Sequence, residues 1–271
     1  MLDIDLDWIP TALDQWVKTI VWFVKVKGAR RRKGAIVEQK RLTMDPILDP
    51  VWQRIKGGLI VSCQAPAGTA IDTPEFIRAQ ALTVEAAGAA AIRAEGLQNI
   101  RAVTSAVSIP VIGLIKSYDA SSDVYITPRA EDVLAIAEAG ADIVAVDATQ
   151  RARWNGQTLE NFYEQVRALT NIPLLADIDS KDNAKAAIEM GFNGIATTLS
   201  GYTNEPSPEL PNLELVKLLS SLTFIPVIAE GGFANPKQVK AAIADGAWAV
   251  CVGTAITNPY ILTKHFIEGA F

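Results

Sequence analysis

The sequence contains few of the residues that most often carry metal or nucleophilic chemistry. Of its 271 residues, one is histidine and two are cysteine. His265 falls in the last helical segment, far from any predicted strand end, so we expect no multi-histidine metal site, no Ser-His-Asp triad and no imidazole base at the strand ends. Cys63 and Cys251 fall within apolar runs and are interpreted as small core residues, not as a disulfide framework. This cysteine usage favours a reducing, cytoplasmic compartment.

The sequence also lacks a hydrophobic run long enough to span a bilayer, although its first 43 residues form a distinct segment. These residues contain nine Lys or Arg and five Asp or Glu, a net charge of +4, whereas residues 44–271 carry a net charge of −9. The apolar stretch 16–27 is interrupted by lysines, and its basic cluster 30–33 follows it, unlike a signal peptide. Three interpretations stay open: an amphipathic helix packed on the barrel or a partner, a segment on an anionic membrane surface, or a start-site artefact upstream of Met44.

Two interleaved internal repeats organise residues 44–271. An Ile-Pro-apolar motif occurs at 109–113, 172–176 and 225–229, and a glycine followed by a short apolar run occurs near 88, 140, 191 and 246. With the apolar run 58–63, these motifs predict eight strands. Stretches of helical period follow several of these strands, at 74–87, 130–139, 159–169, 181–190 and 236–244. We therefore expect an α/β fold, a (β/α)8 TIM barrel with an N-terminal helical extension, and consider an open doubly wound sheet the alternative.

Polar and ionisable residues gather at the predicted C-terminal ends of the strands, where barrels of this kind place their chemistry. Side chains alternate between the interior and exterior of a barrel, so strand parity predicts which of them point inward. One parity unites the following residues: Arg93, Glu95, Lys116, Asp147, Asp177, Asp179, Thr198, Glu230 and Gly253. We expect these residues to converge on the barrel mouth, with structural ion pairs as the alternative for any one of them.

Lysine and carboxylate chemistry remains once histidine is excluded. A partly desolvated lysine near a carboxylate can transfer protons, or can attack a carbonyl as an amine. Lys116 follows the third strand and Glu230 the seventh, so the two face each other across a ring of eight. Acid/base groups on opposite sides of one carbon are what a stereochemical inversion needs, and this geometry favours an epimerase or isomerase. The carboxylates have no compact ligand spacing, so we expect no metal.

The loops after strands seven and eight indicate a phosphorylated substrate. They contain Gly231-Gly232 and Gly253-Thr254, and glycine allows the backbone to approach a ligand closely. Phosphate often binds at these two loops in barrels of this class. The alternative is that the glycines serve only as turns.

Five segments, taken together and in order, resemble bacterial N-acetylmannosamine-6-phosphate 2-epimerases. They are 58–64 (GLIVSCQ), 91–96 (AIRAEG), 111–116 (VIGLIK), 197–203 (TTLSGYT) and 228–231 (IAEG). The resemblance extends from about residue 56 to the C-terminus. It implies interconversion of N-acetylmannosamine 6-phosphate and N-acetylglucosamine 6-phosphate by deprotonation and reprotonation at C2, without a cofactor, in sialic acid catabolism.

The resemblance also implies roles for individual residues. Lys116 would be the main acid/base group and Glu230 its partner. The residues that would bind or orient the sugar, or line its site, are Gln64, Arg93, Asp147, Ser200, Tyr202 and Thr203. Gly231, Gly232, Gly253 and Thr254 would carry the phosphate, and Gly232 departs from the polar or basic residue expected of some relatives. The partner is thus a small sugar phosphate and not nucleic acid; a homodimer and membrane contact stay open.

Two functions from other classes are weighed against the epimerase. A Schiff-base aldolase or lyase, or another isomerase, would use Lys116 on a phosphorylated sugar, and borohydride trapping would distinguish a Schiff base. A non-catalytic barrel that binds a sugar phosphate would show saturable binding without turnover. The presence of both Lys116 and Glu230 favours an enzyme.

Overall fold

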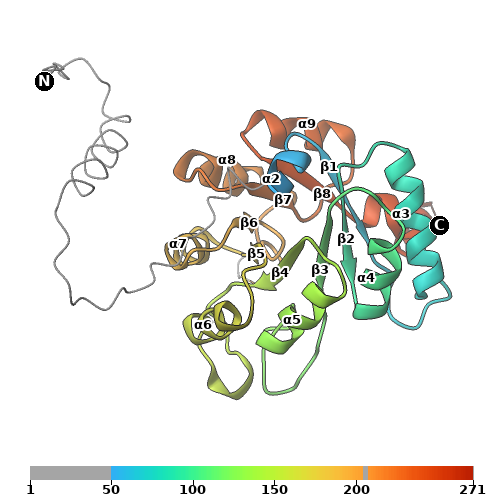
Figure 1. The fold of residues 1–271 in the computed structure, drawn as a ribbon. Coiled ribbons are helices and arrows are strands. Elements are labelled where there is room, and N and C mark those ends of the chain that lie inside the picture. Colours follow the sequence, from blue (N-terminus) through green and yellow to red (C-terminus); the bar gives the residue numbers. More distant parts are fainter. Residues whose placement is uncertain (1–49, 204–206, 271) are drawn as a thin grey trace, which may run out of the picture. The chain divides into compact units, whose positions relative to one another are not determined.

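The computed structural model describes residues 50–203 and 207–270. The predicted extension, residues 1–43, lies outside the described residues. Eight parallel strands form a closed barrel in sequence order (Figure 1). The strands are β1 (Leu59–Cys63), β2 (Ala91–Glu95), β3 (Val111–Leu114), β4 (Ile143–Asp147), β5 (Leu174–Asp177), β6 (Gly194–Ala196), β7 (Val227–Glu230) and β8 (Ala249–Val252). The predicted TIM barrel is confirmed.

One described helix, α2, precedes the first strand, and the helices that follow alternate with the strands or come after the last one. These helices are α2 (Pro50–Ile55), α3 (Pro74–Ala86), α4 (Leu97–Thr104), α5 (Ala130–Glu138), the 3-10 turn η1 (Trp154–Gly156), α6 (Leu159–Leu169), α7 (Lys181–Met190), α8 (Leu213–Leu222), α9 (Pro236–Ala244), α10 (Thr254–Thr257) and α11 (Pro259–Ala270). Three of the predicted helical stretches have these bounds, and two end one residue earlier. Among the described residues, none of the helices combines the length and apolarity needed to cross a membrane.

Local sequence signals explain where several helices begin. The Thr73 side chain accepts a hydrogen bond from the Phe76 amide before α3, and Ser180 does the same for Asn183 at the start of α7. Asn235 and Gln238 form a capping box at α9. These caps satisfy amides that the first helical turn leaves unpaired, and they stabilise the start of each of these helices.

The barrel interior and the layer under the helices are separate apolar clusters, as strand alternation requires. Ile60, Ile112 and Leu175 belong to the interior cluster, whereas neighbouring residues such as Val61 pack outward beneath the helices. Each strand therefore directs alternate side chains along the barrel axis. The next inward-facing residue after the last apolar interior position of a strand, two positions further on, lies at the mouth, and there the sequence places polar groups such as Asp177 and Glu230.

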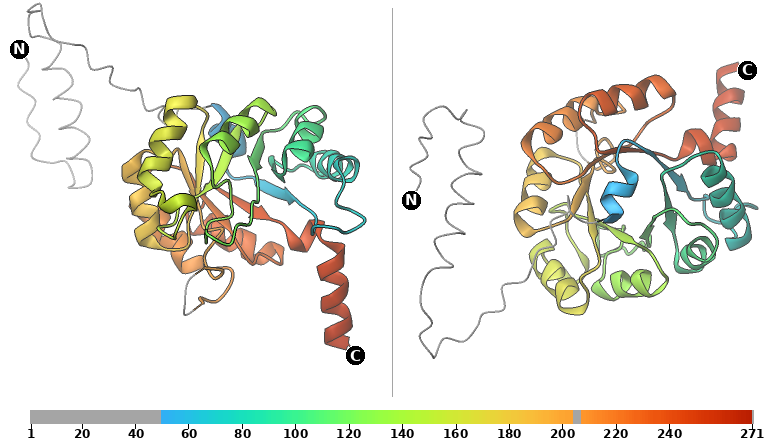
Figure 2. Two further views of the ribbon diagram at one scale, coloured as in Figure 1. Left: turned by 90° about the horizontal axis from the view of Figure 1, so that it is seen from below. Right: turned by 45° about the horizontal axis from the view of Figure 1, so that its top comes forward.

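Helix α2 closes the opposite end of the barrel. It lies across that end in Figure 2, and its Trp52 is fully buried in the interior cluster. Trp248 donates its indole N–H to the Trp52 carbonyl at 2.8 Å. Gly194 starts β6 directly beneath the indole, where an added Cβ would lie 2.7 Å from the Trp52 ring. The indole of Trp52 thus packs where a side chain at residue 194 would otherwise lie.

We expect Trp52→Ala to lower the free energy of unfolding by about 3–5 kcal/mol, because it empties a large buried volume at the barrel bottom. Urea denaturation followed by circular dichroism measures the change. Phe224→Ala removes a ring that is 73% exposed, and this control should alter stability by less than about 0.5 kcal/mol. Equal effects of the two substitutions would contradict the assigned role of Trp52.

Candidate active site

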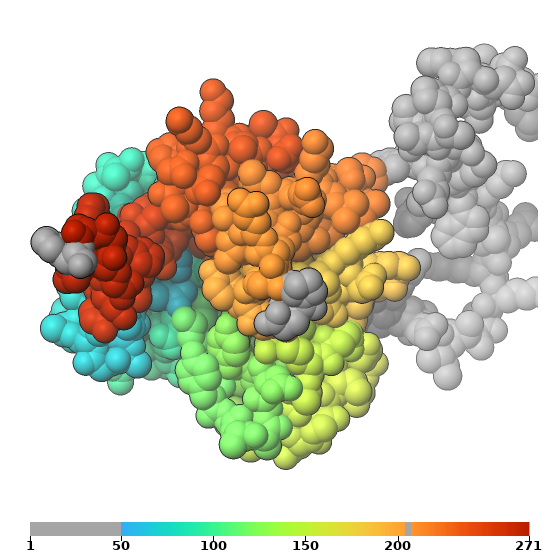
Figure 3. All heavy atoms as spheres, turned by 180° about the vertical axis from the view of Figure 1, so that it is seen from behind, coloured from blue at the N-terminus to red at the C-terminus, as the bar shows by residue number. Residues whose placement is uncertain are grey.

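A cavity of about 630 Å³ opens at the C-terminal ends of the strands. Figure 3 shows this face of the barrel, with the dark red C-terminal helix on one side and the orange segment after β6 on the other. Polar and charged side chains from several strand ends line the cavity: Ser62, Gln64, Arg93, Lys116, Thr198 and Glu230. Elements far apart in the chain thus contribute to one pocket, which is where the fold concentrates chemistry.

Arg93 forms the centre of a buried charge cluster. Its guanidinium donates to both oxygens of Asp177, with Nη1–Oδ1 at 3.1 Å and Nη2–Oδ2 at 2.6 Å. Its Nη1 also lies 3.0 Å from Oε2 of Glu230. Thr198 donates its hydroxyl to the same Asp177 carboxylate at 2.6 Å. Burial alone would lower the pKa of Arg93, but the two carboxylates outweigh it and hold this pKa above its usual value.

Glu230 closes the cluster on β7 and faces the cavity with 14% of its side chain exposed. Burial raises its pKa, Arg93 opposes this rise, and the negative charge of Asp177 adds to it. A hydrogen bond with the Cys251 thiol acts in the opposite direction. The balance leaves Glu230 with a raised pKa, so this carboxyl group is more readily protonated than one in water.

Lys116 follows β3 and extends over the mouth. Its Nζ donates to Oε1 of Gln64 at 2.6 Å, and the Gln64 amide in turn donates to Ser62 Oγ at 2.8 Å. The side chain is exposed by surface area, yet the crowded mouth withholds enough water to lower the pKa of its ammonium. The charge of Glu95 opposes this shift, while that of Arg93 adds to it. Lys116 therefore gives up its proton more readily than an ordinary lysine.

The loops after β7 and β8 form an uncharged part of the same cavity. Gly231, Gly232, Gly253 and Thr254 all line it. Gly232 has a φ of 72°, which favours glycine, and a Cβ added there would lie 2.5 Å from the Cβ of Leu210. Close packing against Leu210 accounts for the glycine at this position. Backbone amides and the Thr254 hydroxyl are the donors that these residues offer to an anion.

Comparison with known proteins identifies the family. Residues 77–270 match the family model described as "Putative N-acetylmannosamine-6-phosphate epimerase". The chain belongs to this family. A relative from Caldanaerobacter subterraneus subsp. tengcongensis is 44% identical over 220 residues, covering 80% of this chain and 92% of its own length. One from Klebsiella pneumoniae subsp. pneumoniae is 46% identical over 214 residues, covering 78% and 90%. Both carry the name "Putative N-acetylmannosamine-6-phosphate 2-epimerase".

Solved structures agree with this membership of the epimerase family. The N-acetylmannosamine-6-phosphate 2-epimerase from Clostridium perfringens superposes with a TM-score of 0.76 at 33% identity, covering 82% of this chain and 96% of that one. A thiamine phosphate pyrophosphorylase from Pyrococcus furiosus has a TM-score of 0.52 at 18% identity, covering 78% and 93%. The second likeness shows the fold alone.

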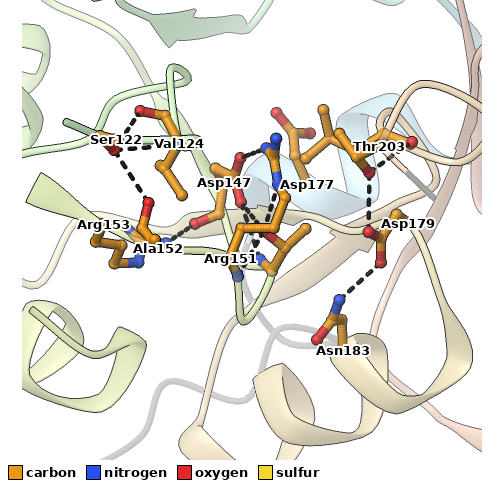
Figure 4. Close-up of polar contacts among 12 residues, drawn as sticks. Ser122, Val124, Asp147, Arg151, Ala152, Arg153, Asp177, Asp179, Asn183 and Thr203 are labelled. Atoms are coloured by element: carbon orange, nitrogen blue, oxygen red, sulfur yellow. Dashed lines mark hydrogen bonds and ion pairs between the residues drawn. The ribbon is translucent and has the colours of Figure 1, made fainter. Parts of the chain in front are cut away.

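The structure brings most of the predicted site residues of this epimerase-family chain to the cavity. Those that line it are Gln64, Arg93, Lys116, Tyr202, Glu230, Gly231, Gly232, Gly253 and Thr254. Ser200 and Thr203 do not line it. Ser200 accepts a hydrogen bond from Asn212 at 2.9 Å, and Thr203 donates to Asp179 at 2.8 Å. Figure 4 shows Asp179 between Thr203 and Asn183, both of which donate a hydrogen bond to its carboxylate.

Asp147 is also absent from the cavity wall, although strand parity directs it to the mouth. Its buried carboxylate accepts hydrogen bonds from Thr149 and from Arg151, while Arg153 donates to its backbone carbonyl (Figure 4). The β4 loop thus folds back over the strand end and pairs Asp147 within itself. Its predicted role in sugar binding stays a prediction.

Tyr125 and His265 are among the cavity-lining side chains that were not predicted. Tyr125 reaches the cavity because the loop after β3 returns beside Lys116, with an isolated bridge between Lys116 and Ile126. His265 also lines the cavity, from α11, although the sequence placed it far from any predicted strand end. Its distance along the chain from a strand end concealed this position, since α11 continues directly from the β8 loop. Among the described residues, no group of three or more His, Cys, Asp or Glu side chains is arranged to hold a metal ion.

We expect Asp177→Asn to lower the free energy of unfolding by about 3–5 kcal/mol, because it removes one partner of a fully buried, hydrogen-bonded ion pair. Urea unfolding measures the change. Guanidinium chloride is avoided because it is a salt and would itself screen the ion pair. Glu189→Gln breaks an exposed pair with Lys185, 3.8 Å apart, and should cost at most about 1 kcal/mol. If Asp177→Asn lowered the free energy of unfolding no more than the control does, burial of Arg93 would not depend on its ion pair with Asp177.

Proposed function

We propose that the chain interconverts N-acetylmannosamine 6-phosphate and N-acetylglucosamine 6-phosphate by moving the proton at C2, with Lys116 and Glu230 as the two acid/base groups. The observation that carries this proposal is their opposite tuning. The pKa of the Lys116 ammonium is lowered and that of the Glu230 carboxyl is raised, and both groups line one cavity. Groups whose environments draw their pKa values toward neutrality are suited to give and take protons.

The proposed reaction begins with the sugar in its open, aldehyde form. The C2–H bond breaks, its proton passes to the neutral amine of Lys116, and its electrons form an enolate with the neighbouring carbonyl. The protonated carboxyl of Glu230 then delivers a proton to the opposite face of C2. Proton exchange with water then returns Lys116 to its neutral amine and Glu230 to its protonated carboxyl. In the reverse reaction Glu230 removes the proton and Lys116 delivers it. Two groups on strands that face each other across the mouth meet the stereochemical requirement of an inversion.

The neighbours of these groups suit the proposed chemistry. Gln64 accepts a hydrogen bond from Lys116 Nζ and so orients the amine. Arg93 holds Glu230 and brings fixed positive charge to the cavity, which stabilises a developing enolate. Tyr202 lines the same cavity and is 61% exposed, in a position to contact a sugar. The phosphate is assigned to the uncharged loops after β7 and β8.

The assembly and location of the protein stay predictions. A homodimer is supported by α11, where none of the side chains is buried and where Phe266 and Ile267 are 79% and 54% exposed. The cytoplasmic location is predicted from cysteine usage. The membrane alternative depends on residues 1–43, which lie outside the described residues.

We expect Lys116→Ala and Glu230→Gln each to lower the rate of epimerisation by about 10²- to 10⁴-fold, because each removes one proton-transfer group. Proton NMR in deuterated water follows loss of the C2 proton signal and appearance of the gluco epimer. Lys185→Ala, which replaces an exposed lysine on α7, is the control and should leave the rate unchanged. If wild-type protein exchanges no proton and borohydride instead traps substrate on Lys116, the Schiff-base alternative replaces this proposal.

We expect Glu95→Gln to move the pH limb that reports Lys116 to lower pH. The carboxylate of Glu95 raises the pKa of Lys116, so its removal leaves desolvation and Arg93 less opposed, and the pKa falls further. The pH dependence of kcat/KM measures the shift. Glu85→Gln, which changes a carboxylate bound to Ser108 on the outer surface, should leave the limb in place. A limb that stayed in place or moved to higher pH in Glu95→Gln would show that Lys116 does not produce it.

A further inference from the structure

The backbone around Lys116 is held from two sides at the barrel mouth. On one side the Lys116 amide donates to Oε1 of Glu95, at the end of β2, at 3.4 Å. On the other side the chain after β3 turns back and runs antiparallel to it, with a bridge between Lys116 and Ile126. The Ser117 amide donates to the Tyr125 carbonyl of this returning chain at 2.9 Å. The position of the Lys116 amine therefore depends on where the returning chain is anchored.

Thr127 anchors the returning chain to the ends of β3 and β4. Its backbone amide donates to the Ile115 carbonyl at 2.7 Å, and its Oγ1 accepts from the Ile115 amide at 3.2 Å. The same hydroxyl donates to the Ala145 carbonyl of β4 at 2.7 Å. The register between β3 and β4 ends at Gly113 and Val144. The Thr127 hydroxyl thus joins the two strands just beyond the point where their direct pairing stops.

The backbone conformation of Thr127 is unusual for its residue type. Its φ is 46°, and the residue is fully buried. Among the described residues, Asn155 is the other non-glycine residue with a positive φ, and a β-branched side chain is seldom found in this region. Only a surrounding structure that holds the residue firmly maintains such a conformation, and strained backbone of this kind gathers at functional sites. Here the strained residue directly follows the bridge that holds Lys116.

We propose that Thr127 is a positioning residue for Lys116: its hydroxyl fixes the returning chain against β3 and β4, and this places the Lys116 amine for proton transfer at C2. The inference rests on the proposed function and extends it to a residue outside the cavity wall. Tyr125 and Ile126 line the cavity, whereas Thr127 does not, so Thr127 acts through the backbone and not on the substrate. A displacement of about 1 Å at a reacting group costs about 10²-fold in rate.

Steady-state kinetics tests this role. Thr127→Val has nearly the same shape but lacks the hydroxyl, so we expect kcat to fall by about 10- to 100-fold while KM for N-acetylmannosamine 6-phosphate changes less than about twofold. Thr127→Ser keeps a hydroxyl and should recover most of kcat. The control is Thr104→Val. It removes a hydroxyl that donates to the Ala139 carbonyl at 2.9 Å, between the C-terminal ends of α4 and α5, and should leave kcat unchanged.

A further variant keeps the test decisive if Thr127→Val does not fold. Glycine adopts a φ of 46° without strain, so Thr127→Gly removes the hydroxyl and relieves the backbone at the same time. We expect the same fall in kcat. Full kcat in the folded variants without the hydroxyl, or a loss in Thr127→Ser equal to theirs, would overturn the inference.

A titration of Lys116 separates this inference from the proposed function. The charged groups that act on its pKa are Arg93, Glu95, Asp177 and Glu230. None of them changes in these variants. Withdrawal from water lowers the pKa of Lys116, and a loosened returning chain lets water reach the amine, so the amine should titrate at higher pH in Thr127→Val than in wild-type protein. NMR of protein labelled with 13C at the lysine Cε measures the shift, and loss of the signal in Lys116→Ala assigns it.

The two failures have different signatures. An unchanged titration of Lys116 in Thr127→Val would overturn the role of Thr127 even in an active epimerase. A titration shifted to higher pH in a protein without epimerase activity would overturn the proposed function and leave the positioning of Lys116 standing.

Discussion

The buried ion pair between Arg93 and Asp177 is the interaction on which the site depends. It joins β2 to β5 across the barrel, and Glu230 on β7 completes it. Two charges taken out of water lose hydration that only close, well-oriented partners restore, so an unpaired Arg93 at this depth would be strongly unfavourable. The barrel can close with a guanidinium inside because two other strands, β5 and β7, supply carboxylate partners for it. This requirement fixes Asp177 and Glu230 in position before any substrate is present.

The same cluster connects the stability of the barrel to its chemistry. Asp177 neutralises Arg93, so less of the positive charge remains to stabilise ionised Glu230, and burial leaves the pKa of that carboxyl raised. Arg93 meanwhile lowers the pKa of Lys116 across the mouth. A barrel top lined with unpaired carboxylates would hold Lys116 protonated. The charge of Arg93 therefore favours the neutral amine of Lys116, whereas burial and the charge of Asp177 favour the protonated carboxyl of Glu230 against the opposing effect of Arg93.

Sequence pattern predicted the parts of this arrangement that depend on periodicity. The interleaved repeats indicated eight strands, and the two-residue alternation identified Arg93, Lys116 and Glu230 as inward-facing, since both signals are fixed by local geometry. The fate of Asp147 depends on the path of the next loop, which returns Arg151 to it, and parity contains no information on that path. The places of Tyr125 and His265 depend likewise on where a loop and a terminal helix travel. Alternation within a strand cannot report such tertiary placement.

The cavity has two chemically different ends because the barrel builds them from different parts of the chain. Strand interiors supply ionisable side chains whose pKa values respond to burial, and these need a rigid, crowded surrounding. The β7 and β8 loops supply backbone donors, whose strength does not depend on protonation. A substrate held by an anion at the loop end would present its carbon to the ionisable end without competing for Arg93. Binding at one end and proton transfer at the other can therefore vary separately, even though they share a single cavity.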